Sequence, residues 1–201
     1  MIDERESDAA LWLAASSGTE RAFVVIFDRY RSRIFSSAYR RTNQISDAEE
    51  IVAIVFLEAW RLRKRVRIVD GSLLPWLLAV TANVTSNLSR SQRRYGRMIA
   101  RLPSPLEQED HAPAVDEQLD GRPCRQVLDD ALASLSAGDR AVIELCLVEE
   151  LPLAAAAAAL ELPVGTVKSR LHRARKQLQS RLAVADLPDD LFAVKTTEEV
   201  A

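Results

Sequence analysis

The chain has 201 residues, enough for one large domain or two small ones, and it is 48% hydrophobic but only 5% aromatic. Alanine, leucine and valine are prominent, which favours packed helices over a β-sandwich. No run of about 18 apolar residues occurs, and the charged start MIDERESDAA does not resemble a signal peptide. Its two cysteines and two histidines lack metal-ligand spacing. We therefore expect a reduced cytoplasmic protein without membrane insertion, metal or cofactor.

The net charge of −2 conceals a segregation of charge along the chain. Residues 57–101 carry 10 basic and 2 acidic side chains, and residues 151–182 carry 6 basic and 1 acidic side chain. The intervening segment, residues 102–150, has 3 basic and 12 acidic side chains. A single basic run is usually a solvated face, whereas two basic runs divided by an acidic one predict two anion-binding surfaces.

The first predicted helix covers about 19–41, because apolar residues recur there at spacings of three and four: Phe23, Phe27, Tyr30, Ile34 and Ala38. Ser46 and Glu49 match a capping box and predict a second helix. We expect this helix to begin at Ser46 and to continue into the basic stretch 61–65. Its predicted core side is Ala48, Val52, Val55, Phe56 and Ala59.

Asp70 and Gly71 predict a break, after which Ser72 could cap a further helix that has Pro75 in its first turn. This helix should pass Trp76, a predicted core residue, and continue toward Arg94. Four prolines and many acids then predict a linker at about 102–123. No strand is predicted anywhere in the chain.

Helices are expected to resume near Val127, and Ser136 with Asp139 forms a second capping-box match. A short alanine-rich helix over 153–160, a four-residue turn and a basic helix over 164–182 form a helix-turn-helix pattern. In the basic helix one face is apolar: Val167, Leu171, Ala174 and Leu178. The opposite face carries hydrogen-bond donors, as a recognition helix in a major groove requires. On these grounds alone a solvated basic face remains an alternative.

Three segments resemble the extracytoplasmic-function subgroup of the sigma-70 family. VGTVKSRLHRARKQL (Val164 to Leu178) resembles the region 4 helix that reads the −35 promoter element. SDAEEIVAIVFLEAWR (Ser46 to Arg61) is similar to region 2.2, which docks on RNA polymerase, and LPWLLAVTANVTSNLSRSQRR (Leu74 to Arg94) is similar to regions 2.3 and 2.4, which open and read the −10 element. No region 3 domain is visible.

The resemblance implies three sets of site residues. Contacts with the polymerase core are expected from Asp47, Glu50, Ile54, Leu57, Glu58 and Arg61. Contacts with the −10 element are expected from Asn83, near the flipped base, from a specificity loop with Thr85, Ser86 and Asn87, and from the phosphate-binding Arg90, Arg93, Arg94 and Arg97. Contacts with the −35 element are expected from Gly165, Thr166, Lys168, Ser169, His172, Arg173, Arg175 and Lys176.

Among the −35 residues, Arg173 could bind a guanine bidentately, whereas Lys168, Arg175 and Lys176 are placed as phosphate contacts. The implied partners are the RNA polymerase core (β′ clamp and β flap), promoter DNA and an anti-sigma protein, with no small-molecule substrate. Two departures from the family are the aliphatic Ile54, where the family has a polar residue, and the all-alanine run 154–159 in the first helix of the helix-turn-helix. That run lacks side chains for phosphate contacts.

The expected fold is all-α, with two small helical domains joined by a flexible linker. The boundaries are a region 2 domain (1–101), an acidic proline-rich linker (102–124), a region 4 helix-turn-helix domain (125–182) and an acidic, disordered tail (183–201). Two other classes compete with this interpretation. A helix-turn-helix repressor or response regulator predicts a ligand or phosphoacceptor domain upstream, and an enzyme predicts an acid–histidine pair, a phosphate loop or a metal site. The sequence shows none of these.

Overall fold

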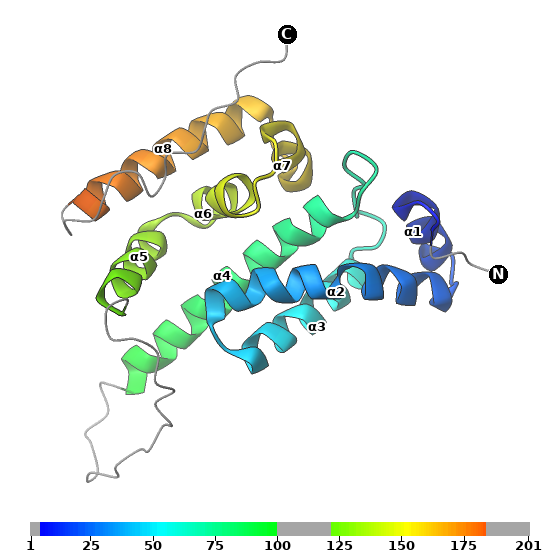
Figure 1. Ribbon diagram of the computed structural model, residues 1–201, viewed down its shortest axis with the longest axis horizontal. Helices are drawn as coiled ribbons and strands as arrows, with labels where there is room; N and C mark the ends of the chain where they lie inside the picture. The colour runs from blue at the N-terminus through cyan, green and yellow to red at the C-terminus, as the bar shows by residue number, and fades with distance from the viewer. Residues whose placement is uncertain (1–4, 100–121, 184–201) are drawn as a thin grey trace.

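The computed structural model describes residues 5–99 and 122–183, and these segments are helical almost throughout (Figure 1). The only strand-like feature in these segments is an isolated bridge between Val69 and Ser72. The elements in chain order are α1 (Asp8–Ser16), α2 (Glu20–Thr42), α3 (Ile45–Arg61), α4 (Leu74–Ile99), α5 (Arg122–Ser134), α6 (Ala137–Ile143), the π-helical turn η1 (Glu144–Val148), α7 (Leu153–Leu160) and α8 (Val164–Ala183). The expected all-α fold is confirmed.

Two groups of helices pack on opposite sides of α4 (Figure 1). The N-terminal group is α1, α2 and α3, and the C-terminal group contacts α4 through α6, η1 and α7. Because α4 has neighbours on both sides, five consecutive residues in its first half are buried: Pro75, Trp76, Leu77, Leu78 and Ala79. A helix that is buried all round needs an apolar sequence all round, and this segment has one. Trp76 is a core residue, as predicted.

The predicted core sides of the helices are confirmed. Every residue predicted for the buried side of α3 has an exposed fraction of 8% or less. On α2 the residues Ile34 and Ala38 are fully buried, while Phe23, Phe27 and Tyr30 are partly buried against the core. None of the helices in the described segments is long and apolar enough to span a membrane.

Several predicted boundaries differ from the structure. The α3 helix begins at Ile45 after the N-cap residue Gln44, so Ser46 lies inside the first turn and is not the cap. The same helix ends at Arg61 and does not continue through the basic stretch 61–65, because Leu62 already leaves the helical conformation as the C-cap. The α5 helix begins at Arg122, within the predicted linker. The rest of the linker (100–121) and the tail from residue 184 lie outside the described residues.

Candidate nucleic-acid interface

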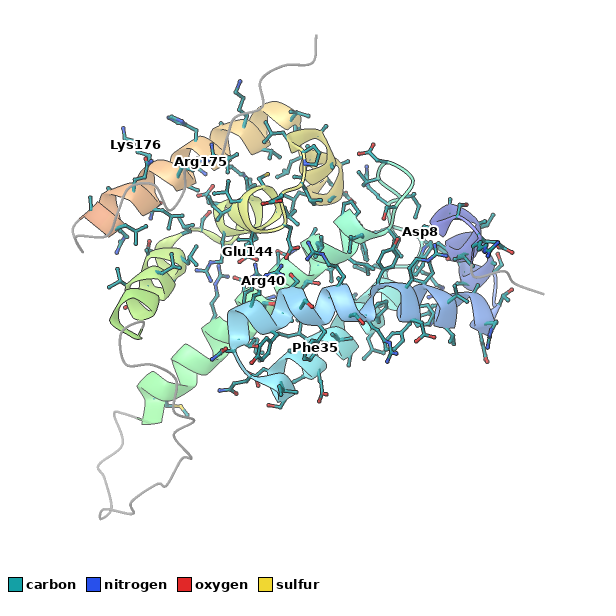
Figure 2. All side chains as sticks on the ribbon, viewed as in Figure 1. Asp8, Phe35, Arg40, Glu144, Arg175 and Lys176 are labelled. Carbon is teal, nitrogen blue, oxygen red and sulfur yellow. The ribbon has the colours of Figure 1, made fainter. Side chains whose placement is uncertain are left out.

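The α8 helix has a buried back and an exposed cationic front. Its four predicted apolar residues have exposed fractions of 0–8% and pack toward α6 and α7. The predicted DNA-facing residues that reach solvent are Gly165, Lys168, Ser169, His172, Arg173 and Lys176, and Thr166 is half-buried. Figure 2 shows Lys176 projecting from α8 away from the other helices. This face presents charge and hydrogen-bond donors, the groups that bind phosphates and base edges.

Arg173 is engaged within its own domain. Its Nη2 donates to Oδ1 of Asp139 at 2.5 Å and its Nε donates to Oδ2 at 3.3 Å, so both arms of the guanidinium hold one carboxylate. The Arg173 side chain is nevertheless 62% exposed. A bidentate contact with guanine would need the same donors, and Arg173 must therefore leave Asp139 before it can read a base in that way.

Arg175 does not lie on the exposed front. It is half-buried, and its charge acts on Cys146 in η1. Burial raises the pKa of the Cys146 thiol to about 11, and the nearby Arg175 lowers it by a smaller amount. The phosphate contact predicted for Arg175 therefore stays a prediction, for a side chain that is less exposed than Lys168 and Lys176.

Asp139 connects the recognition helix to α6. Ser136 is the N-cap of α6 and accepts a hydrogen bond from Asp139 N (3.1 Å), while its hydroxyl donates to Asp139 Oδ2 (2.8 Å). The predicted cap at Ser136 is thus confirmed. Burial of Asp139 tends to raise the pKa of its carboxyl, but the hydrogen bonds from Arg173 and Ser136 outweigh burial and bring the pKa below its ordinary value.

We expect Asp139→Asn to lower the free energy of unfolding at neutral pH by about 1–3 kcal/mol, because it weakens one charge-assisted pair and the helix cap. Since the folded-state pKa of Asp139 is depressed, its contribution is present above the unfolded-state pKa and is lost as the pH falls through the folded-state value. Urea unfolding of both proteins from pH 7 to pH 3 should show the difference shrinking in acid. A difference that stays constant with pH would contradict an ionised Asp139.

On α4, a polar stripe reaches solvent beside the buried face. Asn83, Asn87 and Arg90 are exposed, and their spacing of four and three residues places them on one side of the helix. Asn83 and Asn87 offer amides for base edges and Arg90 offers a guanidinium for phosphate. The side chains of Arg93, Arg94 and Arg97 lie outside the described residues.

The predicted specificity loop at 85–87 is wrong, since α4 is an unbroken helix through these positions. Thr85 is 3% exposed and its hydroxyl donates to Thr81 O at 2.8 Å, and Ser86 is 7% exposed. Both hydroxyl groups are covered where helices pack against α4 on two sides. In this arrangement neither of these two predicted −10 residues is presented to DNA.

The buried carboxylate of Asp8, which the sequence did not indicate, holds the segment where α4 begins. Asp8 in α1 accepts hydrogen bonds from Arg29, from the Tyr30 hydroxyl and from the backbone N of Leu73, the last at 2.6 Å. Ser72 accepts a hydrogen bond from Leu74 N at 3.1 Å, but α4 begins at Leu74, so Ser72 lies one residue before the N-cap position at which it was predicted. Burial, followed by the hydrogen bond to Asp8, raises the pKa of Tyr30. The Asp8 carboxylate, labelled in Figure 2, thereby joins α1, α2 and the segment that precedes α4.

The predicted docking face of α3 is largely exposed. Leu57 is 68% exposed, Glu50 and Arg61 are exposed, and Ile54, Asp47 and Glu58 are half-buried. Arg61 donates from Nη2 to Glu58 Oε2 at 2.6 Å, an exposed pair that orients both side chains along the helix. An aliphatic side chain framed by opposite charges suits a helix-on-helix contact.

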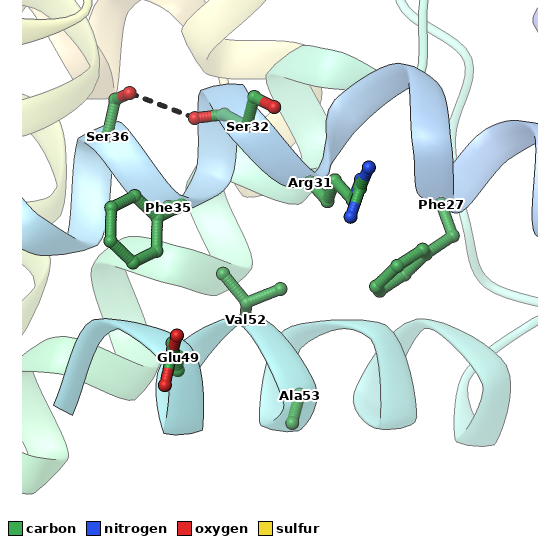
Figure 3. Close-up of a pocket in the computed structure, with 8 residues that line it drawn as sticks. All are labelled: Phe27, Arg31, Ser32, Phe35, Ser36, Glu49, Val52 and Ala53. Carbon is green, nitrogen blue, oxygen red and sulfur yellow. Dashed lines mark hydrogen bonds between the residues drawn. The ribbon is translucent and has the colours of Figure 1, made fainter. Parts of the chain in front are cut away.

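An open groove of about 480 Å³ lies between α2 and α3, next to this docking face (Figure 3). Its apolar lining comes from both helices, and Figure 3 shows Val52 of α3 pointing between Phe27 and Phe35 of α2, while Arg31 and Glu49 also line it. Phe35 also stacks on Tyr39, with ring centroids 5.9 Å apart. The sequence predicted a docking face on α3 alone and did not indicate this groove with α2.

Comparisons with known proteins match two segments of the chain to known families. Residues 26–95 match the sequence model of sigma-70 region 2, and residues 125–178 match that of sigma-70 region 4. The chain is 33% identical over 160 residues to the ECF RNA polymerase sigma factor SigE of Mycolicibacterium smegmatis, an alignment that covers 77% of this chain and 59% of SigE. It is 30% identical over 169 residues to SigL of Mycobacterium tuberculosis, covering 84% of this chain and 92% of SigL.

Among solved structures, CnrH in complex with the cytosolic domain of CnrY has a similar fold, with a TM-score of 0.56 and 26% identity over 90% of this chain and all of CnrH. Fold and sequence together define a transcription initiation factor, a class without catalytic activity of its own. The chain belongs to the extracytoplasmic-function subgroup of the sigma-70 family of RNA polymerase sigma factors.

Proposed function

We propose that this chain binds core RNA polymerase in the cytoplasm and directs it to promoters by using α3 for docking, α4 for the −10 element and α8 for the −35 element. The observation that carries the proposal is the pair of exposed polar faces on α4 and α8, one in each region that matches the family. Each face carries amide or hydroxyl groups beside cations. That combination is what binding to base edges and phosphates requires.

At the −10 element, the stripe of Asn83, Asn87 and Arg90 supports base recognition coupled to strand opening. Extruding a base from the stack costs a few kcal/mol, and hydrogen bonds to the edge of the extruded base offset that cost. Asn83 is positioned to provide them, while Arg90 holds the backbone of the open strand. Thr85 and Ser86 could join these contacts only after the helices that cover them move.

At the −35 element, Ser169 and His172 are the base-reading candidates, because their side chains are exposed in the first turns of α8. Gly165 leaves open space at the start of the helix, where nothing lies within 4 Å of the position a Cβ would take, so a phosphate can approach the backbone closely. Lys168 and Lys176 flank this surface as phosphate contacts. The role of Arg173 depends on its release from Asp139.

Replacing Lys176 by alanine should weaken binding to all −35 sequences alike and reduce the slope of log affinity against log salt by about one, because one phosphate contact is lost. Arg181→Ala is the matched control, since Arg181 is an exposed cation in the last turn of α8. Titrations of holoenzyme with a set of single-base −35 variants at several salt concentrations provide the measurement. A changed order of base preference in Lys176→Ala would contradict the phosphate role.

For docking, α3 and its neighbouring groove offer a surface for the β′ clamp, and the C-terminal helices would contact the β flap. An anti-sigma protein is proposed as a further partner. The support is the likeness to CnrH, which was solved in complex with the cytosolic domain of another protein, CnrY.

Reconstituted transcription tests the proposed function. Core polymerase should start at defined sites on genomic DNA fragments when this chain is added, and should not start there without it. A chain that binds DNA but leaves the start sites of core polymerase unchanged would instead be a separate helix-turn-helix regulator.

A further inference from the structure

Four polar residues on one side of α2 bind carboxylates from the other domain. We name Arg33, Ser37, Arg40 and Arg41 the α2 basic strip. Glu149, which follows η1, forms an ion pair with Arg33 Nη2 at 2.7 Å and accepts hydrogen bonds from Arg40 Nη2 (2.5 Å) and the Ser37 hydroxyl (2.7 Å). Glu144 pairs with Arg41. Figure 2 shows Arg40 and Glu144 at the junction between α2 and the C-terminal helices.

The strip has the donor set of an oxyanion site. Two guanidinium groups and a hydroxyl converge on one carboxylate whose side chain is only 4% exposed. Arginine binds phosphate with the same geometry that it uses for carboxylate. The three arginines also exceed the two carboxylates in charge, and Arg140 adds a further cation nearby. Burial lowers the pKa of Arg41 to about 9, Glu149 raises it, and Arg140 and Arg40 lower it further.

Stability alone does not account for this cluster. Buried ion pairs lose much of their attraction to desolvation, and apolar residues of similar volume often stabilise an interface as well or better. A contact that only held the two domains together would thus need no excess of arginine. The charge on α2 is better explained by an anion that binds when the carboxylates are absent.

The promoter requires the domains to separate. The −10 and −35 elements lie about 25 base pairs apart, or about 85 Å at about 3.4 Å per step. The α8 helix, 20 residues at about 1.5 Å each, is about 30 Å long, and its domain packs directly against α4. When α8 reaches the −35 element, Glu144 and Glu149 must leave α2. The strip then becomes exposed on a helix that packs against α4.

We infer that the α2 basic strip is a phosphate-binding site for promoter DNA near the −10 element, and that Glu144 and Glu149 occupy it while the domains are packed together. The inference rests on the proposed function, which brings the −10 DNA to α4. In this arrangement the two carboxylates stand where phosphates would bind. The strip adds affinity that is independent of base sequence, since phosphate contacts carry no sequence information directly.

Glu149→Gln provides the background for the test, because it removes the carboxylate charge that Arg33 and Arg40 bind and leaves Glu144 in place. The probe is a fluorescent fork-junction DNA with a random-sequence single-stranded end, bound by the free chain at several salt concentrations. We expect Glu149→Gln to bind more tightly than the wild type. Adding Arg33→Ala and Arg40→Ala should then weaken binding about tenfold and reduce the salt slope by about two.

The charge-matched control adds Arg21→Ala and Arg181→Ala to Glu149→Gln, since both arginines are exposed and lie outside the strip, on α2 and at the end of α8. This control should bind like Glu149→Gln alone. Arg33→Lys with Arg40→Lys should keep most of the salt dependence, because both positive charges remain. This variant replaces the alanine variant in the test if the alanine variant fails to fold. If the strip and control variants bind equally, or if strip variants bind more tightly, the arginines only hold the domains together and the inference is wrong. Normal promoter-specific transcription in that case would leave the proposed function standing.

Discussion

Leu57→Asp is expected to weaken binding to core RNA polymerase by about thirtyfold or more, the effect of losing a hot-spot contact of about 2 kcal/mol. Leu57 is 68% exposed in the middle of the docking face of α3, so aspartate costs little in the free chain. In the complex the same carboxylate would lie in an apolar contact without a partner, which is costly. Ile54 is half-buried, which makes Leu57 the cleaner position for this change.

The control for this prediction is Leu13→Asp. Leu13 is a leucine on α1 with a 70% exposed side chain, well matched to Leu57 but outside the docking face. Fluorescence titration of labelled chain with core polymerase should show normal affinity for Leu13→Asp. If both variants bind normally while keeping the thermal unfolding midpoint of the wild type, the polymerase docks elsewhere.

Asn83→Ala is expected to reduce open-complex formation on duplex promoter DNA about tenfold or more, because it removes hydrogen bonds to the extruded base worth about 1–3 kcal/mol. On a template whose −10 region is already unpaired, the unstacking cost has been met beforehand and the loss should be much smaller. Permanganate reactivity of unpaired thymines measures the open complex directly on both templates.

The exposed amide Gln179 on α8 supplies the control, and Gln179→Ala should behave like wild type on both templates. An equal loss for Asn83→Ala on duplex and premelted DNA would assign Asn83 to general binding or to structure. Asn87→Ala, one turn further along the same stripe, should share the duplex-specific defect if the whole stripe contacts the open strand.

Local patterns were sufficient to predict most of the helices. The back of α8 follows from its apolar spacing, and α7 matches the predicted range 153–160, because alanine is the strongest helix former. The cap at Ser136 was predicted because both partners lie within four residues. The predicted cap at Ser46 is wrong. The helix begins earlier, after Gln44, and has no side-chain cap, so the capping-box pattern lies inside its first turn.

Long-range pairings could not be predicted in the same way. Asp8 meets Leu73 N across 65 positions, and Glu149 meets Ser37 across 112. No periodicity connects such residues, so the sequence gives no sign that these acids are buried. The same limit applies to Arg173. The sequence predicts that it can contact a base, but it does not predict the hydrogen bond from Arg173 to Asp139 that the fold creates.

The alanine run in α7 has a consequence for how this protein can vary. Three consecutive residues, Ala155, Ala156 and Ala157, are each 3% exposed or less, since α7 is enclosed by α4, η1 and α8. Methyl side chains let these helices approach closely, and any larger side chain would have to displace a neighbour at a cost of about 1–3 kcal/mol. A segment that looks like low-complexity sequence should therefore tolerate substitution as poorly as a conventional apolar core. At these three positions side-chain volume therefore limits substitution, whereas Ala154 is exposed and has room for a larger side chain.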